Sequence, residues 1–149
     1  MKMENNMSLK IKAISRNEAF ARSVVGAFCV ELNPTMDEIN DIKTAVSEAV
    51  TNCIVHAYDY KDGEIEINAD IQGSCLHIEI KDFGVGIDDI AKARQPFFTT
   101  KPDEERSGMG FTVMESFMDT LTVEKNSPCG TIVKMSKTFG MNKRKADEK

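Results

Sequence analysis

The chain has 149 residues, of which 41% are hydrophobic and 29% are charged, and its formal net charge is −5. These values are typical of one soluble globular domain, and the acidic balance argues against a nucleic-acid-binding protein and favours a basic protein partner. No apolar run approaches the roughly 20 residues that cross a bilayer, and the polar N-terminal segment does not resemble a secretory leader. We therefore expect a cytoplasmic protein that binds neither membrane nor nucleic acid.

The four cysteines are widely spaced and form no Cys-x-x-Cys pair, so nothing in the sequence indicates a zinc site. Thiols in a reducing compartment are usually unpaired and buried. We therefore expect buried free thiols at all four positions. These are Cys29, Cys53, Cys75 and Cys129.

Hydrophobic periodicity predicts a strand and then two helices in the first part of the chain. Apolar and polar residues alternate over Leu9–Ile14, as in a strand with one buried face. The next apolar residues recur every four positions, which predicts an amphipathic helix that Asn33-Pro34 ends. They are Phe20, Val24, Phe28 and Leu32. Thr35 and Glu38 form a capping-box pattern at the start of a second helix, which we expect to run to about Tyr58.

Two alternating runs predict a pair of strands in the middle of the chain. They cover residues 65–71 and 76–80, with the turn signal Asp62-Gly63 before them and Gly73-Ser74 between them. The periodicity stops after Gly86. A loop as long as the aperiodic segment that follows usually covers or binds a ligand in a compact domain.

The last part of the chain predicts one more helix and two more strands. Residues 111–118 have the pattern of a helix, residues 121–125 and 131–137 have the pattern of strands, and the polar tail 142–149 is typical of disorder. The order strand, helix, helix, strand, strand, loop, helix, strand, strand predicts an α+β fold. In such a fold the helices cover one face of a mixed or antiparallel sheet.

Two polar residues of the second predicted helix are candidates for chemistry. Glu48 and Asn52 are four positions apart, so they share one helix face, at the edge of its apolar arc. A side chain at such an edge can reach a cleft beside the core. A carboxylate there could act as a general base, and an amide oxygen could bind Mg²⁺, which prefers hard oxygen ligands. The alternative is that Glu48 and Asn52 only form a solvated polar edge of the helix and have no chemical role.

The stretch Lys81–Asp88 contains two familiar fragments. Asp82-Phe83-Gly84 also occurs in protein kinases, but the His-Arg-Asp loop that kinases require is missing from the chain. Gly84-Val85-Gly86 begins some dinucleotide-binding loops, but Asp89 stands where their third glycine should be. An aspartate at a strand end can instead accept a hydrogen bond from an adenine amino group. Glycines beside it let the backbone approach the flat base.

A second pair of glycines, Gly108 and Gly110, opens the predicted helix 111–118. Free amides at a helix N-terminus are well placed to bind phosphate. Lys101 and Arg106, just before these glycines, can neutralise phosphate charge. These features together predict a nucleotide-binding site.

The segments resemble the boxes of the GHKL superfamily of ATPases and kinases. Ser47–Asn52 corresponds to its N box, Asp82–Gly86 to its first G box and Ser107–Phe111 to its second. Thr99–Pro102 and Glu105–Phe111 narrow the resemblance to the small serine kinases that act as anti-sigma factors in endospore-forming bacteria. The resemblance implies a Bergerat-type two-layer α/β sandwich, with a mixed sheet and helices on one face, that binds ATP or ADP with Mg²⁺.

The resemblance extends over about residues 9–138 and implies one domain for the whole chain, 1–149. Within it, residues 88–107 would form the ATP lid. The ends, 1–7 and 141–149, would be flexible.

The same resemblance implies a role for each matching residue. Glu48 is the expected catalytic base, Asn52 the Mg²⁺ ligand and Asp82 the carboxylate that recognises adenine. Arg106 would act near the γ-phosphate as a second catalytic residue. The remaining ATP-binding positions are Gly84, Gly86, Ile87, Thr99, Thr100, Lys101, Ser107, Gly108, Met109, Gly110, Phe111 and Thr131.

Kinases of this family phosphorylate a serine of a small anti-anti-sigma protein, and they bind a sigma factor as a homodimer and keep it from RNA polymerase. The resemblance therefore implies a serine/threonine protein kinase and anti-sigma factor whose partner is a sporulation sigma factor of the sigma F type. The dimer would use the first strand and helix, and Arg22 matches a partner contact. Sensor histidine kinases share the boxes, but neither His56 nor His77 has a phosphoacceptor context.

Two alternatives stay open at this point. A general-stress anti-sigma kinase carries similar motifs. An ATP-dependent sigma-binding module without kinase activity would need the same nucleotide pocket, although Glu48 argues against it because binding alone requires no base.

Overall fold

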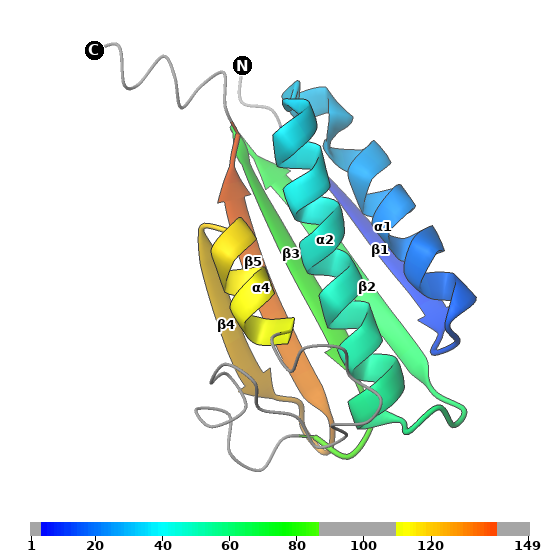
Figure 1. The fold of residues 1–149 in the computed structure, drawn as a ribbon. Coiled ribbons are helices and arrows are strands. Elements are labelled where there is room, and N and C mark those ends of the chain that lie inside the picture. Colours follow the sequence, from blue (N-terminus) through cyan, green and yellow to red (C-terminus); the bar gives the residue numbers. More distant parts are fainter. Residues whose placement is uncertain (1–3, 87–109, 140–149) are drawn as a thin grey trace.

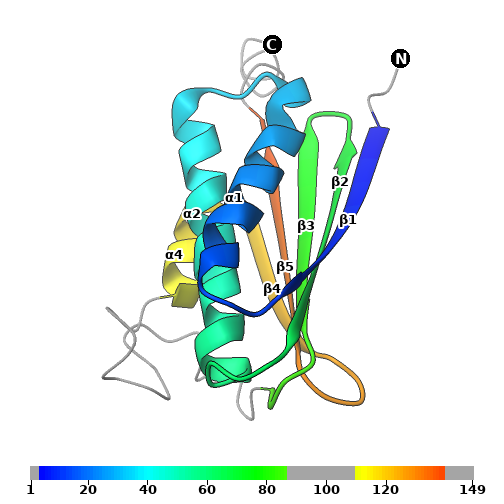
Figure 2. The same ribbon diagram turned by 90° about the vertical axis from the view of Figure 1, so that its right-hand side faces the viewer.

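The computed structural model describes residues 4–86 and 110–139. They form two layers, a five-stranded sheet and helices that cover one of its faces (Figure 1). In chain order the elements are β1 (Glu4–Lys12), α1 (Arg16–Phe28), the 3-10 turn η1 (Cys29–Leu32), α2 (Met36–Asn52), the π-helical η2 (Cys53–Ala57), β2 (Glu64–Gln72), β3 (Cys75–Asp82), α4 (Gly110–Phe117), β4 (Thr120–Lys125) and β5 (Thr131–Thr138). The view in Figure 2 places α1, α2 and α4 on the same side of the sheet, as predicted.

The strands lie in the order β1-β2-β3-β5-β4, and each of the four pairings is antiparallel. The sequence allowed a mixed or an antiparallel sheet, and the described strands form the antiparallel one. β3 lies between β2 and β5, and Lys81 near the end of β3 pairs with Ile132 near the start of β5. This register brings Asp82 next to Thr131 at one end of the sheet.

α2 is the central helix of its layer, because it packs against both α1 and α4. The predicted capping box is confirmed: Glu38 N donates to Thr35 Oγ1 at 3.1 Å, and Thr35 N donates to Glu38 Oε1 at 2.8 Å. The buried residues of α2 recur at helical spacing and form one stripe toward the sheet. They are Ile42, Ala45, Val46, Ala49 and Val50. Among the described residues, neither α2 nor any other helix is long and apolar enough to cross a membrane.

The inward face of the central strands completes the core. Its most deeply buried residues alternate along β2 and β3, as the predicted strands 65–71 and 76–80 require. They are Ile65, Ile67, Ile71, Leu76, Ile78 and Ile80. The Asp62-Gly63 signal lies between η2 and β2 and does not join two paired strands. Instead Gly63 O accepts the Ala13 N–H at 2.9 Å, which ties the start of β2 to the end of β1.

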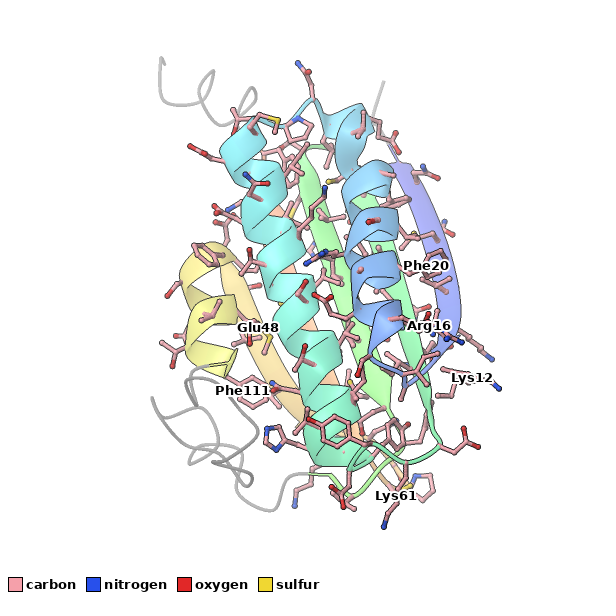
Figure 3. The ribbon with its side chains drawn as sticks, turned by 45° about the vertical axis from the view of Figure 1, so that its right-hand side comes forward. Lys12, Arg16, Phe20, Glu48, Lys61 and Phe111 are labelled. Atoms are coloured by element: carbon pink, nitrogen blue, oxygen red, sulfur yellow. The ribbon has the colours of Figure 1, made fainter. Side chains whose placement is uncertain are left out.

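The predicted stripe is only partly buried: Leu32, in η1, is buried and Phe28 packs against the core. Phe20 is 50% exposed, whereas Ala21 and Val25 are fully buried. The contact with α2 is made through small residues, since a Cβ added to Gly26 would come within 2.7 Å of Lys43 Cε. Small side chains allow two helices to approach closely, so close helix packing decided which face turns inward. Phe20 is left on the outer side of α1 (Figure 3).

β1 also begins earlier than predicted, at Glu4 and not at Leu9. Its pairing with β2 runs from Glu4 opposite Gln72 to Lys12 opposite Glu64. Backbone pairing therefore extends beyond the part of the strand whose apolar residues alternate.

The prediction of four buried thiols is half right. Cys29 and Cys53 are buried and free, but Cys75 is partly exposed and Cys129 is exposed. Cys129 lies in the turn between β4 and β5 and is not part of the core that the described residues form. Burial raises the pKa of the Cys29 thiol to about 11, so this thiol stays protonated at neutral pH.

Candidate nucleotide-binding site

The candidate site lies where the end of α2 meets the end of β3, at the lower end of the molecule in Figure 1. Asn52 is the last residue of α2 and is partly exposed, and Glu48 lies one helical turn before it. Asp82 is the last residue of β3. In Figure 3, Glu48 lies on the side of α2 next to α4, and Phe111 lies at the start of α4. The predicted base, metal ligand and adenine carboxylate thus come from two elements that end together.

Asp82 is a buried carboxylate held by backbone amides. Only 5% of the residue is exposed. Its Oδ1 accepts the Gly84 N–H and the Thr131 N–H, each at 3.1 Å. Burial raises the pKa of Asp82, while these two amides and the Cys53 thiol lower it. Because both amides bond the same oxygen, the carboxylate keeps acceptor capacity on its other oxygen. It can therefore accept a hydrogen bond from a ligand without losing its support.

Cys53 connects this carboxylate to the helix that carries Asn52. The thiol is buried and interacts with the Asp82 carboxylate. Desolvation, followed by the charge of Asp82, raises the pKa of Cys53 well above its ordinary value. The thiol is therefore protonated at neutral pH and can donate a hydrogen bond to the carboxylate. Since Cys53 directly follows Asn52, the end of α2 and the end of β3 are joined through it.

The backbone N–H groups of the three residues after Asp82 all donate to acceptors within the protein. Phe83 N donates to Tyr58 Oη at 2.7 Å, Gly84 N to Asp82 Oδ1 at 3.1 Å and Val85 N to Ala57 O at 3.1 Å. Amides that cradle phosphate must be free to point at it. These three are not, so the glycines here do not form a phosphate loop, in agreement with the missing third glycine of the dinucleotide motif.

Close backbone approach explains the glycine at position 84. A Cβ on Gly84 would collide with the carbonyl oxygen of Ala57. The chain can lie this close to the end of η2 only without a side chain. Gly86 follows in the left-handed region, with φ of +79°. Gly84 is therefore packed directly against the end of η2, whereas a Cβ added to Gly86 would lie 3.3 Å from Gly130 O, in the turn between β4 and β5.

The turn between β4 and β5 supports Asp82 from the other side. Asn126 Nδ2 donates to Asp82 O at 2.9 Å, and the Cys129 thiol donates to Phe83 O at 3.2 Å. Gly130 has φ of +107°, and a Cβ there would collide with Asp82 O. Thr131, which starts β5, is buried with 6% of its surface exposed. The predicted contact of Thr131 with the adenine end of the site fits this position.

The donor set at Asn52 suits a metal ion that arrives with a nucleotide. Within residues 4–86 and 110–139, no group of three or more His, Cys, Asp or Glu side chains is arranged to hold a metal ion. Mg²⁺ in nucleotide sites usually keeps waters and phosphate oxygens and takes one or two protein oxygens. A partly exposed asparagine at a helix end can supply one such oxygen. The residues present therefore fit Mg²⁺ bound together with phosphates.

Part of the predicted site falls outside the described residues, as does the predicted lid. These positions are Ile87, Thr99, Thr100, Lys101, Arg106, Ser107, Gly108 and Met109. Gly110 and Phe111 open α4; Gly110 is buried, and Phe111 packs against the core. Arg22 lies on the exposed side of α1, where its Nη1 donates to Glu18 Oε1 at 3.3 Å.

Sequence reasoning missed the residues that hold Asp82 and the segment after it in place. They are Cys53, Tyr58, Asn126 and Cys129. The Cys129–Phe83 contact joins residues 46 positions apart, and no periodicity predicts such a contact. The only available signal was position: Cys53 adjoins Asn52, and Cys129 lies in a short turn before Thr131.

Comparison with known proteins places this fold in a class. A family model described as "Histidine kinase-like ATPase domain" matches residues 12–137. The solved structure of the RsbU and RsbW domains of Rv1364c from Mycobacterium tuberculosis has a similar fold, with a TM-score of 0.63 at 16% identity. That match covers 91% of this chain and 32% of the other chain. The fold is thus that of a GHKL-type ATPase domain.

Curated relatives match over nearly their whole length. The protein named Anti-sigma F factor from Caldanaerobacter subterraneus subsp. tengcongensis is 56% identical over 143 residues, 96% of this chain and 100% of the relative. Those from Clostridium acetobutylicum and Bacillus velezensis are 53% and 48% identical, over 93% and 95% of this chain and 97% of each relative. The chain belongs to the histidine kinase-like ATPase domains and, within them, to the family of proteins named anti-sigma F factor.

Proposed function

We propose that the chain is an anti-sigma factor and a serine/threonine protein kinase. It binds Mg-ATP, phosphorylates a serine of a small anti-anti-sigma protein, and keeps a sporulation sigma factor of the sigma F type from RNA polymerase in the cytoplasm. The names and full-length match of the relatives support this proposal. The observation that carries it is the buried Asp82 carboxylate, which two backbone amides orient beside the end of the helix that bears Glu48 and Asn52.

Each described residue has a task in nucleotide binding. Asp82 accepts a hydrogen bond from the adenine amino group, and Gly84, which has no Cβ to meet Ala57 O, lets the segment after Asp82 lie against the end of η2. Asn52 offers its side-chain oxygen to Mg²⁺, which, when bound, neutralises charge on the phosphates. By resemblance, Lys101 and Arg106 add positive charge near the γ-phosphate.

Glu48 is the proposed general base. It accepts the proton of the substrate serine hydroxyl while the serine oxygen forms a bond to the γ-phosphorus and the bond from phosphorus to the ADP oxygen breaks. The half-buried position of Glu48 on α2, one turn before Asn52, keeps the base and the metal ligand on one helix face. The products are ADP and a phosphoserine, and the proton stays on Glu48 until solvent removes it.

The proposed homodimer uses β1 and α1. β1 is an edge strand of the described sheet, and such a strand can pair with another chain. Phe20 on the neighbouring helix exposes 50% of its surface. Arg22 lies on the same helix, and we propose that it contacts the sigma factor or the anti-anti-sigma protein.

A transfer assay tests the proposal. The chain is incubated with γ-labelled ATP, Mg²⁺ and the anti-anti-sigma protein from the same genome, and label should appear on a serine. A serine-to-alanine substrate is the control and should stay unlabelled. If the chain binds ATP and the sigma factor but transfers no label, the chain is the sigma-binding module without kinase activity. If it binds no ATP, the nucleotide site itself is refuted.

A further inference from the structure

Tyr58 joins three segments at the candidate site. It caps the C-terminal end of η2, and its hydroxyl accepts the Phe83 N–H at 2.7 Å and donates to Glu64 O at 2.6 Å. A Cβ on Gly63 would lie 2.5 Å from the Tyr58 ring, so the ring lies flat against the chain just before β2. One side chain thus ties the end of η2, the start of β2 and the segment after β3 to one another.

The segment that Tyr58 holds is the floor of the proposed base pocket. Of the three consecutive amides after Asp82, only that of Phe83 depends on a side chain outside the segment. The next amide, of Gly84, reaches the Asp82 carboxylate. A shift of Phe83 would therefore move Gly84, and with it one of the two amides that orient the carboxylate. Tyr58 can be altered without changing any backbone group of the pocket.

We propose that Tyr58 is a positioning residue that sets the adenine selectivity of the site without touching the nucleotide. This inference rests on the proposed function, namely that the pocket beside Asp82 takes adenine. Its action is indirect. The hydroxyl fixes Phe83, Phe83 fixes the segment to Gly86, and the segment fixes the carboxylate relative to the base.

Selectivity is sensitive to this chain of contacts. Adenine presents an amino donor to a carboxylate, whereas hypoxanthine presents a carbonyl oxygen at the same ring position. A rigid, buried carboxylate facing that carbonyl leaves two acceptors unpaired, which strongly disfavours binding. A carboxylate that can move away discriminates less, because it avoids the unfavourable contact. Loosening the segment should therefore lower selectivity as well as affinity.

The test uses the full chain and the variant Tyr58→Phe, which removes only the hydroxyl. Affinities for ADP and for inosine diphosphate are measured by calorimetry well below the unfolding temperature. We expect the dissociation constant for ADP to rise about fivefold to tenfold, in line with the loss of one to two hydrogen bonds. The preference for ADP over inosine diphosphate should fall by a similar factor. Tyr60→Phe is the matched control, since Tyr60 is 53% exposed, and it should behave like wild type.

The outcomes separate positioning from simple stability. If Tyr58→Phe lowers only the unfolding temperature and keeps both affinity and preference, Tyr58 is a structural residue and the proposal is overturned. If wild type binds ADP no better than inosine diphosphate, adenine recognition at Asp82 fails, and the positioning role fails with it. If wild type prefers ADP and Tyr58→Phe keeps that preference, the positioning role of Tyr58 is overturned, but adenine recognition at Asp82 is not.

A second measurement covers the case in which Tyr58→Phe does not fold. The chain contains two tyrosines, so uniform labelling with 3-fluorotyrosine gives two ¹⁹F signals. Tyr60→Phe removes one of them and identifies the Tyr58 signal. Saturation of the Tyr60→Phe variant with ADP should shift the remaining Tyr58 signal. A Tyr58 signal that stays unmoved while ADP binds would contradict the proposal.

Discussion

The Oδ1 atom of Asp82 accepts the backbone N–H of Thr131 at 3.1 Å, although 49 positions separate these residues in the chain. The antiparallel pairing of β3 with β5 creates this contact, since it places Lys81 opposite Ile132. Gly84 N supports the same oxygen from within the loop. The carboxylate is therefore oriented before any ligand arrives, which makes it the most informative position to change.

Asp82→Asn should keep the fold and weaken ADP binding by about tenfold to a hundredfold. A hydrogen bond to a charged acceptor contributes about 1.5–3 kcal/mol, and the neutral amide loses this term. Titration calorimetry measures the change. Glu124→Gln is the control, because it breaks an exposed ion pair with Lys134 and should bind ADP as wild type does. An Asp82→Asn variant with wild-type affinity would exclude Asp82 from the base pocket.

The same substitution should change the pH dependence of stability. Burial raises the pKa of Asp82 from its ordinary value of 3.8. Between the ordinary and the raised pKa, the folded state binds more protons than the unfolded chain, so stability falls as pH rises through this range. At neutral pH the ionised carboxylate thus destabilises the fold. Without nucleotide, Asp82→Asn should unfold at a higher temperature than wild type at pH 7, and the difference should shrink as pH falls. A difference that is constant at every pH would refute this account.

Glu48→Gln should separate binding from phosphoryl transfer. The amide cannot accept the serine proton, so the transfer rate should fall by about 10²-fold to 10⁴-fold. The affinity for ADP should stay within about twofold of wild type, since the base does not hold the nucleotide. Label transfer and calorimetry on the same preparation measure both quantities. Transfer at the wild-type rate would rule out Glu48 as the base.

Arg22→Ala should weaken partner binding and leave nucleotide binding intact. Arg22 lies on the exposed side of α1, and an arginine at the centre of an interface often contributes about 2 kcal/mol or more, which is about thirtyfold in affinity. Its ion pair with Glu18 is exposed, so its loss should have little effect on the fold. Biolayer interferometry with the sigma factor and with the anti-anti-sigma protein measures the change. Lys61→Ala, which removes another exposed cation, is the control, and unchanged binding of both partners by Arg22→Ala would place the interface elsewhere.

Gly130→Ala should destabilise the fold and impair ADP binding together. The added Cβ meets the Asp82 carbonyl oxygen, and alanine is strained at φ of +107°. We expect a loss of about 2 kcal/mol or more in the free energy of unfolding. Gly73→Asn is the control: this glycine also has positive φ, but a Cβ added to it would meet nothing within 4 Å, and asparagine tolerates this region. Denaturant unfolding compares the two, and equal stability would show that the turn can move away from Asp82.

Several elements follow directly from neighbouring residues. The Thr35–Glu38 capping box starts α2 where predicted, because both of its hydrogen bonds lie within one turn. The strands over 65–71 and 76–80 follow from alternation, since successive side chains of a strand point to opposite faces. The GHKL boxes also point to Asp82, Asn52 and Glu48 through residue type and spacing alone.

Other features depend on contacts between distant segments. Phe20 fits a helical apolar stripe as well as Ala21 does, but only close packing of α1 on α2 selects the stripe with the small residues. Cys129 lies within the turn between β4 and β5, and the local sequence did not predict that its thiol contacts Phe83 O. Likewise, no local pattern marks Tyr58 as the partner of the Phe83 amide.

Local sequence was enough to predict most of the elements and the inward face of the sheet, because periodicity and capping act over a few positions. It could not predict that Thr131 and Gly84 share one oxygen of Asp82, or that Tyr58 holds the segment after Asp82. These contacts depend on the strand register and on where α2 ends relative to β3. Both are set by packing of the whole core and not by any one segment.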